Sequence, residues 1–534
     1  MDEADVLIIG AGASGGVAAG ALVEAGFDVV CLEQGEWPTP SDYPANRSTY
    51  ELEARKQWSA SPNLRGATTD YPINESSSDI SPLMYSGVGG SMVLYAADWP
   101  RLLPSDFRVR TLDDVADDWP LRYADLQPFY DRTDRAFGVS GVGGDPAYPD
   151  GDEPPLPPLP IGEIGLRMAR AQDKLGWHWW PAPQAVLSAN YGGRRACVQY
   201  GSCMYGCPEG AKASTDVTHW PSAVERGARL ITGARVSRIL VSKKGLATGA
   251  EYVRPDGSWH TIKAKVVVMA ANAIGTSRIL LNSASPRHPD GLANSSGLVG
   301  KRLMMHPYAN VMGYFSDDMH SWNGHVGGKI SSFEFYETDT DRGFVRGAKW
   351  GVTPTGGPLQ AAIPTRAGHA VWGPEHHEQV RKHLGRTINW NIYGEDLPDE
   401  ANRVTIDSAL TDSSGIPAPK IDYTVSDNSR QLLDFNIDRA TESLRTAGAY
   451  EVVAEPLMRY SGWHLLGTAR MGEDAQSSVV DGYGRSHDIP NLYIVDGSVF
   501  VTSGGVNPTS TIAALALRSV EHLIATRRHQ QIPI

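Results

Sequence analysis

Two apolar runs and a helix rich in small residues dominate the start of the chain. Val6 to Ile9 and Val29 to Leu32 are apolar at every position, which is typical of strands buried on both faces of a parallel sheet. Between them, Gly10-x-Gly12-x-x-Gly15 leads into an Ala-rich stretch that predicts a helix. The pattern therefore predicts a strand–helix–strand unit.

Similar pieces recur later in the chain. Apolar strands are predicted at residues 229–240 and 265–270, and the second leads into a helix over 276–281. A further buried strand begins near Asn491, followed by a loop and a long terminal helix. We expect these pieces to join the first unit in one sheet, built from both ends and part of the middle of the chain.

The region from His306 to Met458 has a different pattern, with short strand-like pieces and turns. Residues 402–407 and 419–425 are examples, and a turn rich in Ser and Gly joins them. This pattern favours a largely antiparallel sheet. The Pro-rich, acidic stretch 145–160 is interpreted as a surface linker, because its prolines prevent regular structure.

At 534 residues the chain is too long for one ordinary core, which agrees with two lobes. The predicted fold class is α/β. A discontinuous Rossmann-like, cofactor-binding domain is expected over 1–110, 190–305 and 460–534. The second lobe, substrate-binding and built on the antiparallel sheet, would take 111–189 and 306–459, linker included.

Composition argues against several kinds of partner. The formal net charge of -13 disfavours nucleic acid and anionic membrane surfaces, which attract basic patches. The sequence has no apolar run of about eighteen residues, so no membrane span is predicted. The first strand begins too early to leave room for a signal peptide, which predicts a cytoplasmic protein. The sequence favours no particular oligomeric state.

The glycine motif indicates a dinucleotide site. Gly10 permits a tight turn, Gly12 lets a pyrophosphate approach the backbone, and Gly15 lets the helix pack close to the strand. The helix N-terminus offers unpaired N–H groups to phosphates. Glu33, at the end of the second strand, is placed to accept hydrogen bonds from a ribose. The alternative is a glycine-rich turn without a ligand.

Four sets of residues together resemble the glucose–methanol–choline (GMC) oxidoreductases. They are the N-terminal motif, SGVGGS at 86–91, VVVMAANAIGTSRILLNS at 266–283, and the C-terminal pair 464–472 and 495–511. CPEGAKAS, NRVTID and GGVNPTST are most similar to the bacterial branch of sugar dehydrogenases, pyranose oxidases and glycoside 3-oxidases. The resemblance implies bound FAD and the oxidation of an alcohol to a carbonyl.

The resemblance also implies site residues. His464 would be the catalytic base and Asn507 would orient the substrate hydroxyl; the alternatives are a core histidine and a helix-capping asparagine. The terminal helix would point its N-terminus at the flavin. Residues expected to bind FAD are Gly10, Gly12, Ala13, Ser14, Gly15, Glu33, Gly87, Gly89, Gly90, Ser91, Val236, Ala270, Asp496, Gly497, Asn507, Pro508 and Thr509.

By this resemblance, the expected reaction converts a secondary alcohol of a small sugar or glycoside to a ketone, as pyranose oxidases and C- or O-glycoside 3-oxidases do. The electrons would go to O2 or another redox acceptor, with an oxidase expected ahead of a dehydrogenase. The alternatives are a dehydrogenase that reduces a cytochrome or quinone, and a non-redox enzyme like the hydroxynitrile lyases. Aromatic residues at 177–180 and 191–205 could stack on sugar faces or pack in the core.

The spacing Cys197-x5-Cys203-x3-Cys207 has two interpretations. Some bacterial sugar dehydrogenases of this branch carry a three-iron cluster on a comparable loop, and three thiols at this spacing could ligate one here. The alternative, which we prefer, is a loop of reduced and mostly buried thiols with no metal. Zinc is not expected, because no nearby histidine supplies a fourth ligand.

The flavin is predicted to be held without a covalent bond. Some family members attach it to a histidine near the Gly-Gly loop, but residues 90–95 here read GSMVLY, with neither His nor Cys. Precipitation of the purified protein with acid should therefore release a yellow chromophore into the supernatant. Colour that stays in the washed pellet would contradict the prediction.

Overall fold

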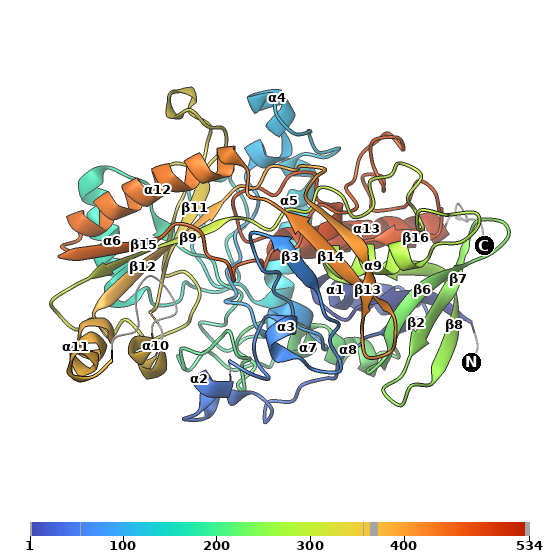
Figure 1. The fold of residues 1–534 in the computed structure, drawn as a ribbon, viewed down its shortest axis with the longest axis horizontal. Coiled ribbons are helices and arrows are strands. Elements are labelled where there is room, and N and C mark those ends of the chain that lie inside the picture. The colour runs from blue at the N-terminus through green and yellow to red at the C-terminus, as the bar shows by residue number, and fades with distance from the viewer. Residues whose placement is uncertain (1–2, 54, 356, 364–371, 529–534) are drawn as a thin grey trace.

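The computed structural model describes residues 3–53, 55–355, 357–363 and 372–528. Two large sheets lie in different halves of the elongated molecule (Figure 1). Both chain ends lie beside the first sheet, and the second sheet lies in the opposite half. The mixed α/β class predicted from the sequence is confirmed, because one sheet is mainly parallel and the other antiparallel.

The first sheet has the strand order β5-β2-β1-β8-β7-β6, with β16 also paired to β8. Its strands are β1 (Ala4–Ile9), β2 (Val29–Leu32), β5 (Arg229–Ile231), β6 (Arg235–Val241), β7 (Ala247–Val253), β8 (Trp259–Met269) and β16 (Leu492–Ile494). The start of β8 pairs antiparallel with β7, and its end pairs parallel with β1 and β16. The long strand β8 thus joins an antiparallel meander to a parallel nucleotide-binding sheet.

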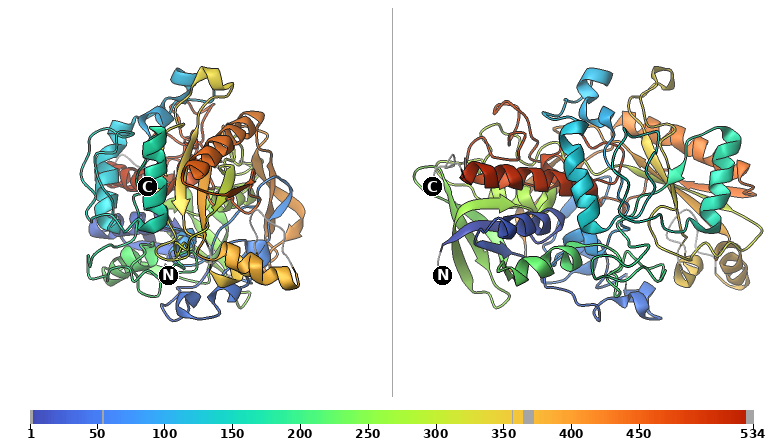
Figure 2. Two further views of the ribbon diagram at one scale, coloured as in Figure 1. Left: turned by 90° about the vertical axis from the view of Figure 1, so that its left-hand side faces the viewer. Right: turned by 180° about the vertical axis from the view of Figure 1, so that it is seen from behind.

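Helices contributed by distant segments cover one side of this sheet. Helix α1 (Ala13–Glu24) contacts α13 (Thr509–Arg528), which also contacts α5 (Tyr123–Phe137). Figure 2 shows α1 and α13 side by side, with α5 crossing them. Helix α9 (Asn272–Asn282) follows β8 directly. No helix in the described part of the chain has the length and apolar character needed to cross a bilayer.

The second sheet has the order β15-β9-β12-β11-β10-β4, and every pairing in it is antiparallel. Its strands are β4 (Trp180–Pro181), β9 (Tyr308–Tyr314), β10 (Ile330–Ser332), β11 (Ala348–Thr353), β12 (Thr387–Gly394) and β15 (Glu451–Glu455). Helices α12 (Asp427–Thr446) and α6 (Gly162–Leu175) pack on it. Trp350 and Trp390 fill the core between the layers.

Short elements complete the fold. The helices not yet named are α2 (Tyr50–Glu53), α3 (Pro62–Arg65), α4 (Val109–Asp113), α7 (Thr215–Thr218), α8 (Trp220–Glu225), α10 (Pro358–Ala362) and α11 (Pro374–His383). A third sheet pairs β13 (Arg403–Thr411) with β14 (Pro417–Tyr423), and β14 with β3 (Asn74–Ser78). Within 145–160 the structure has only an isolated bridge, between Leu156 and Ser140.

Two segments differ from the sequence predictions. The single strand predicted over 229–240 is two strands, because a turn at Gly233, with φ +58°, separates β5 from β6. The strands predicted at 402–407 and 419–425 do pair antiparallel, as β13 and β14. They pack on α9, however, and stand apart from the six-stranded sheet.

Candidate active site

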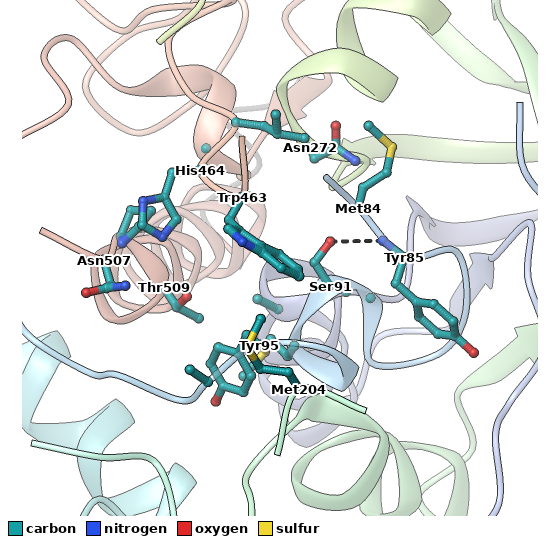
Figure 3. Close-up of a pocket in the computed structure, with 18 of the residues that line it drawn as sticks. Met84, Tyr85, Ser91, Tyr95, Met204, Asn272, Trp463, His464, Asn507 and Thr509 are labelled. Carbon is teal, nitrogen blue, oxygen red and sulfur yellow. Dashed lines mark hydrogen bonds between the residues drawn. The ribbon is translucent and has the colours of Figure 1, made fainter. Parts of the chain in front are cut away.

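One large cavity, with a volume of about 420 Å³, collects most of the residues predicted from the sequence. Figure 3 shows His464 and Asn507 near each other, with Trp463 projecting beside Ser91. The predicted residues in its lining are Gly10, Gly12, Ala13, Ser14, Glu33, Gly90, Ser91, Val236, Ala270, His464, Asp496, Gly497, Asn507, Pro508 and Thr509. Fifteen predicted residues from distant parts of the chain therefore line one cavity.

The start of α1 and the Gly-Gly loop meet at the nucleotide end of this cavity. Gly12 is the N-cap of α1, and no side chain caps it. Gly90 has φ +55°, and a Cβ placed on it would lie 2.7 Å from the Gly12 Cα. The two loops are in contact through glycine backbone, and no side chain caps α1. The first N–H groups of α1 can therefore bind phosphate oxygens in the cavity.

Glu33 is fixed by backbone donors. Its carboxylate accepts hydrogen bonds from the N–H of Ala11 at 2.9 Å and of Gly35 at 2.9 Å. Burial raises the pKa of Glu33, and these backbone donors counteract part of that shift. Its place at the end of β2 lets a remaining lone pair face a ribose.

Three predicted cofactor residues lie outside the cavity lining. Gly15 packs against the backbone of Gly10, where a Cβ would lie 2.0 Å from the carbonyl oxygen. Gly87 and Gly89 belong to the Gly-Gly loop, and the Gly89 N–H donates to the carbonyl oxygen of Ala11. These three glycines therefore allow close backbone packing, while their neighbours face the cavity.

Asp496 connects β16 to α9 beneath the cavity. One carboxylate oxygen accepts from the Ser498 N–H at 3.0 Å, and the other accepts from the Thr276 hydroxyl at 2.5 Å. The first turn of α13 lies nearby, since Pro508 and Thr509 also line the cavity. The N-terminal end of this long helix thus faces the cavity, and its dipole favours negative charge there.

His464 is buried at the opposite end from the nucleotide loops, with 8% of its surface exposed. Burial lowers its pKa well below the usual range, and positive charge on His306 or Lys349 acts in the same direction. The imidazole is therefore neutral at neutral pH, and one of its ring nitrogens has a lone pair that can accept a proton.

Lys349 holds the carboxamide of Asn507, a contact that the sequence analysis missed. Its ammonium donates to the Asn507 Oδ1 at 2.8 Å and lies 3.6 Å from the Asp98 carboxylate. Because Lys349 can only donate, this contact fixes the amide oxygen on its side and leaves the NH₂ group on the other. The only sequence signal was a lysine within the apolar pattern of β11.

His306 and Tyr308 are two further partners that the sequence analysis missed. The Nδ1 atoms of His306 and His464 are 2.8 Å apart. The Tyr308 hydroxyl lies 3.1 Å from both ring nitrogens of His464. An antiparallel bridge between Met304 and Leu466 sets this pairing. His306 follows Met304 by two residues and His464 precedes Leu466 by two, so the antiparallel register places the histidines opposite each other.

The lining near His464 is polar without a free cation. Its hydroxyl and amide side chains are Tyr308, Thr353, Thr355, Asn391 and Tyr393. Among the described residues that line the cavity, Arg278 is the only arginine or lysine. Its guanidinium donates to Asp412 at 2.7 Å and covers the ring of Tyr71. This wall suits neutral hydroxyl-bearing compounds better than carboxylates.

The two aromatic groups in the sequence separate in space. Trp177 packs edge-on against Phe335 and Trp350, so it belongs to the core of the second lobe. None of the residues 177–180 lines the cavity. Met204 and Tyr205, from the cysteine-rich loop, do line it.

The cysteine-rich loop also encloses a second, small cavity of about 20 Å³. Cys197, Cys203 and Cys207 all line it, and burial raises the pKa of Cys197 to about 11. Lys212, which is buried, donates to the carbonyl oxygen of Cys203 at 2.6 Å. Within the described residues, no three or more His, Cys, Asp or Glu side chains are gathered as a metal site.

Comparisons with known proteins agree with this geometry. Two sequence models described as GMC oxidoreductase match residues 166–308 and 398–516, and an FAD binding domain model matches 3–49. A 2-methyl-1,2-propanediol dehydrogenase from Mycolicibacterium austroafricanum is 42% identical, over 99% of this chain and 96% of its own. The chain belongs to the GMC oxidoreductase family.

Other relatives extend the comparison. The fructose dehydrogenase large subunit of Gluconobacter japonicus is 30% identical, over 98% of both chains. Paromamine 6'-oxidase of Streptomyces fradiae is 32% identical, over 97% of this chain and 90% of its own. The crystal structure of pyridoxine 4-oxidase from Mesorbium loti superposes with a TM-score of 0.68 at 17% identity, covering 97% of this chain and 99% of that one.

This GMC oxidoreductase is an FAD enzyme, and its cavity fits that cofactor. The capless start of α1 can hold the pyrophosphate, and Glu33 can hold the ribose. Gly12 and Gly90 are so close that a Cβ on Gly90 would collide with the Gly12 backbone, so only glycine allows this contact beside the cavity.

Replacing Gly90 with Ala should weaken FAD binding about tenfold or more, or about 1.4 kcal/mol. The new Cβ would lie 2.7 Å from the Gly12 backbone and would push the two phosphate-facing loops apart. Fluorescence titration of the apoprotein with FAD measures the affinity. Gly192→Ala is the matched control, since Gly192 has φ +54° but no atom within 4 Å of its Cβ position. Equal FAD affinity in the two variants would refute the role of this contact.

Proposed function

We propose that the protein oxidises a secondary alcohol of a small neutral sugar or glycoside to a ketone, using FAD. The observation that carries the proposal is the arrangement of His464 and Asn507. A neutral imidazole and a carboxamide with a fixed orientation line the same cavity, together with neutral hydroxyl and amide groups.

His464 would act as the base. The proton of the substrate hydroxyl passes to the imidazole, so one O–H bond breaks and one N–H bond forms. The NH₂ group of Asn507 donates to the same oxygen and stabilises the negative charge that develops there. Lys349 maintains this orientation, because its bond to Oδ1 keeps the amide from turning over.

When bound, FAD supplies the two-electron acceptor, which takes up the carbon-bound hydrogen together with its bonding electrons. The N-terminus of α13 contributes a positive dipole end at the cavity wall, worth on the order of 1 kcal/mol toward a nearby negative charge.

The relatives support a substrate that carries more than one hydroxyl group. The proteins 30–42% identical to this chain are named for a diol, for fructose and for paromamine. The neutral lining of the cavity agrees with such compounds, because its amides and hydroxyls can hydrogen-bond several alcohol groups at once.

His464→Ala and Asn507→Ala should each slow anaerobic flavin reduction by substrate about a hundredfold or more. The flavin absorption spectrum should stay unchanged, because neither change removes a phosphate- or ribose-binding group. Stopped-flow absorbance at the oxidised-flavin band measures the rate. His260→Ala, at an exposed histidine on β8, is the matched control and should reduce at the unmodified rate. An unchanged rate in His464→Ala would exclude this histidine as the base.

Anaerobic mixing with a panel of compounds tests the substrate class. Neutral sugars, glycosides and vicinal diols should bleach the oxidised-flavin band, whereas sugar acids should bleach it at least about tenfold more slowly, because the cavity offers them no free cation. Bleaching by the acids alone would refute the neutral class. No bleaching by any alcohol would favour a non-redox role.

A second candidate is a dehydrogenase that passes the electrons to a cytochrome or quinone. Gly201, Met204 and Tyr205 line the main cavity, and the same loop contributes Cys197, Cys203 and Cys207 to the lining of the small one, so the loop lies between the two cavities. Admitting air after bleaching distinguishes the oxidase from the dehydrogenase. The flavin of an oxidase recovers its yellow colour, whereas the flavin of this dehydrogenase stays reduced. Stoichiometric iron in elemental analysis would support the relay, and its absence would remove it.

A further inference from the structure

Three segments meet behind His464 and form a chain of hydrogen bonds that ends at a backbone carbonyl. His306 precedes β9, His464 follows β15, and Gly504 lies in the loop before α13. The His306 Nε2 bonds to the carbonyl oxygen of Gly504, and its Nδ1 lies 2.8 Å from the Nδ1 of His464. His306 itself lies outside the cavity lining, so it touches the base and not the substrate.

The chemistry of these atoms leaves one arrangement of protons. A carbonyl oxygen only accepts hydrogen bonds, so the Nε2 of His306 must carry a proton. Burial lowers the pKa of His306 to about 4, so the ring is neutral and its Nδ1 has no proton. A short contact between two Nδ1 atoms needs one proton, which must therefore lie on the Nδ1 of His464.

We propose that His306 is a positioning residue that holds the proton of His464 on Nδ1, so that Nε2 is the atom that accepts the proton of the substrate. The proposal rests on the proposed function of His464. In this step the substrate O–H bond breaks and an Nε2–H bond forms, while the Nδ1–H bond to His306 remains. The carbon-bound hydrogen leaves with its electron pair to the flavin.

The backbone around His306 shows that this position is enforced. His306 has φ +54°, a left-handed conformation that costs about 1 kcal/mol or more for a residue other than glycine. The neighbouring bridge keeps it in place, since Met304 and Leu466 exchange two backbone hydrogen bonds at 3.0 and 3.1 Å. The N–H of Met305 donates to buried Asp396 at 2.9 Å.

Tyr308 is consistent with the same proton arrangement. Burial raises the pKa of Tyr308 well above its usual range, so its hydroxyl keeps its proton. That hydroxyl lies 3.1 Å from both ring nitrogens of His464, so it can donate to whichever nitrogen carries the free lone pair, which is Nε2 in this arrangement. A substrate hydroxyl would take its place as donor.

Nitrogen NMR on the FAD-bound enzyme labelled with ¹⁵N-histidine tests the tautomer directly. The His464 signals are identified by their loss in His464→Gln. Without substrate at neutral pH, Nδ1 should be protonated and Nε2 unprotonated, as their well-separated ¹⁵N shifts report. A proton on Nε2 of His464 would overturn the proposal, whatever the enzyme's activity.

Two variants of His306 test the consequence for turnover. His306→Leu removes the acceptor, so anaerobic flavin reduction should slow about a hundredfold, with the substrate Kd changed less than about threefold. His306→Asn keeps an oxygen that can accept from the Nδ1 of His464 and tolerates a positive φ, so it should recover most of the rate.

The control measurements separate this role from a structural one. Both variants should have the flavin spectrum of the unmodified enzyme, and their melting temperatures should differ by no more than about 5 °C. Equal rates in His306→Leu and His306→Asn would overturn the proposal, and so would wild-type reduction by His306→Leu. If His306→Leu does not fold, the NMR result on the unmodified enzyme decides. Loss of activity in His464→Ala tests the proposed function separately.

Discussion

Burial of the side chains at one end of the cavity is the constraint on which the proposed catalytic geometry depends. Lys349 and His306 have none of their surface exposed, and His464 has 8%. A buried polar group without a partner costs about 1–3 kcal/mol, so each of these side chains must find one nearby. Their partners are Asp98 and Asn507 for the lysine and Gly504 for the histidine pair, and these contacts fix the orientation of the groups proposed to face the substrate.

Both lobes contribute to that end of the cavity. The antiparallel sheet supplies Lys349 from β11 and Tyr308 from β9. The loops flanking β16 and preceding α13 supply His464 and Asn507. The strands are rigid supports. The loop that carries His464 is held instead by its backbone pairing with another segment, through the bridge between Leu466 and Met304. The positions of the proposed catalytic groups thus depend on the packing of one lobe against the other more than on any single element.

The sequence predicted the parts whose signal is local. A glycine motif between two apolar runs is sufficient to place β1, α1 and β2, because turn chemistry and burial both operate over a few residues. His464 and Asn507 were predicted by resemblance, and the structure brings them to one cavity. His306 could not be found in this way, since its partner is 158 residues away and only the antiparallel register joins them. Trp177 was ambiguous for a related reason: an aromatic cluster looks the same whether it faces a sugar or a core.

The last strand and helix of the chain have a consequence for biosynthesis. Strand β16 pairs with β8, and α13 packs on α1, so the unit that begins at Ala4 lacks its final neighbours until residues near 528 have been made. The apolar face of α1 and one edge of β8 therefore remain uncovered until residues 492–528 have been synthesised. For the same reason, removal of α13 would expose α1, which lies about 490 residues earlier in the sequence.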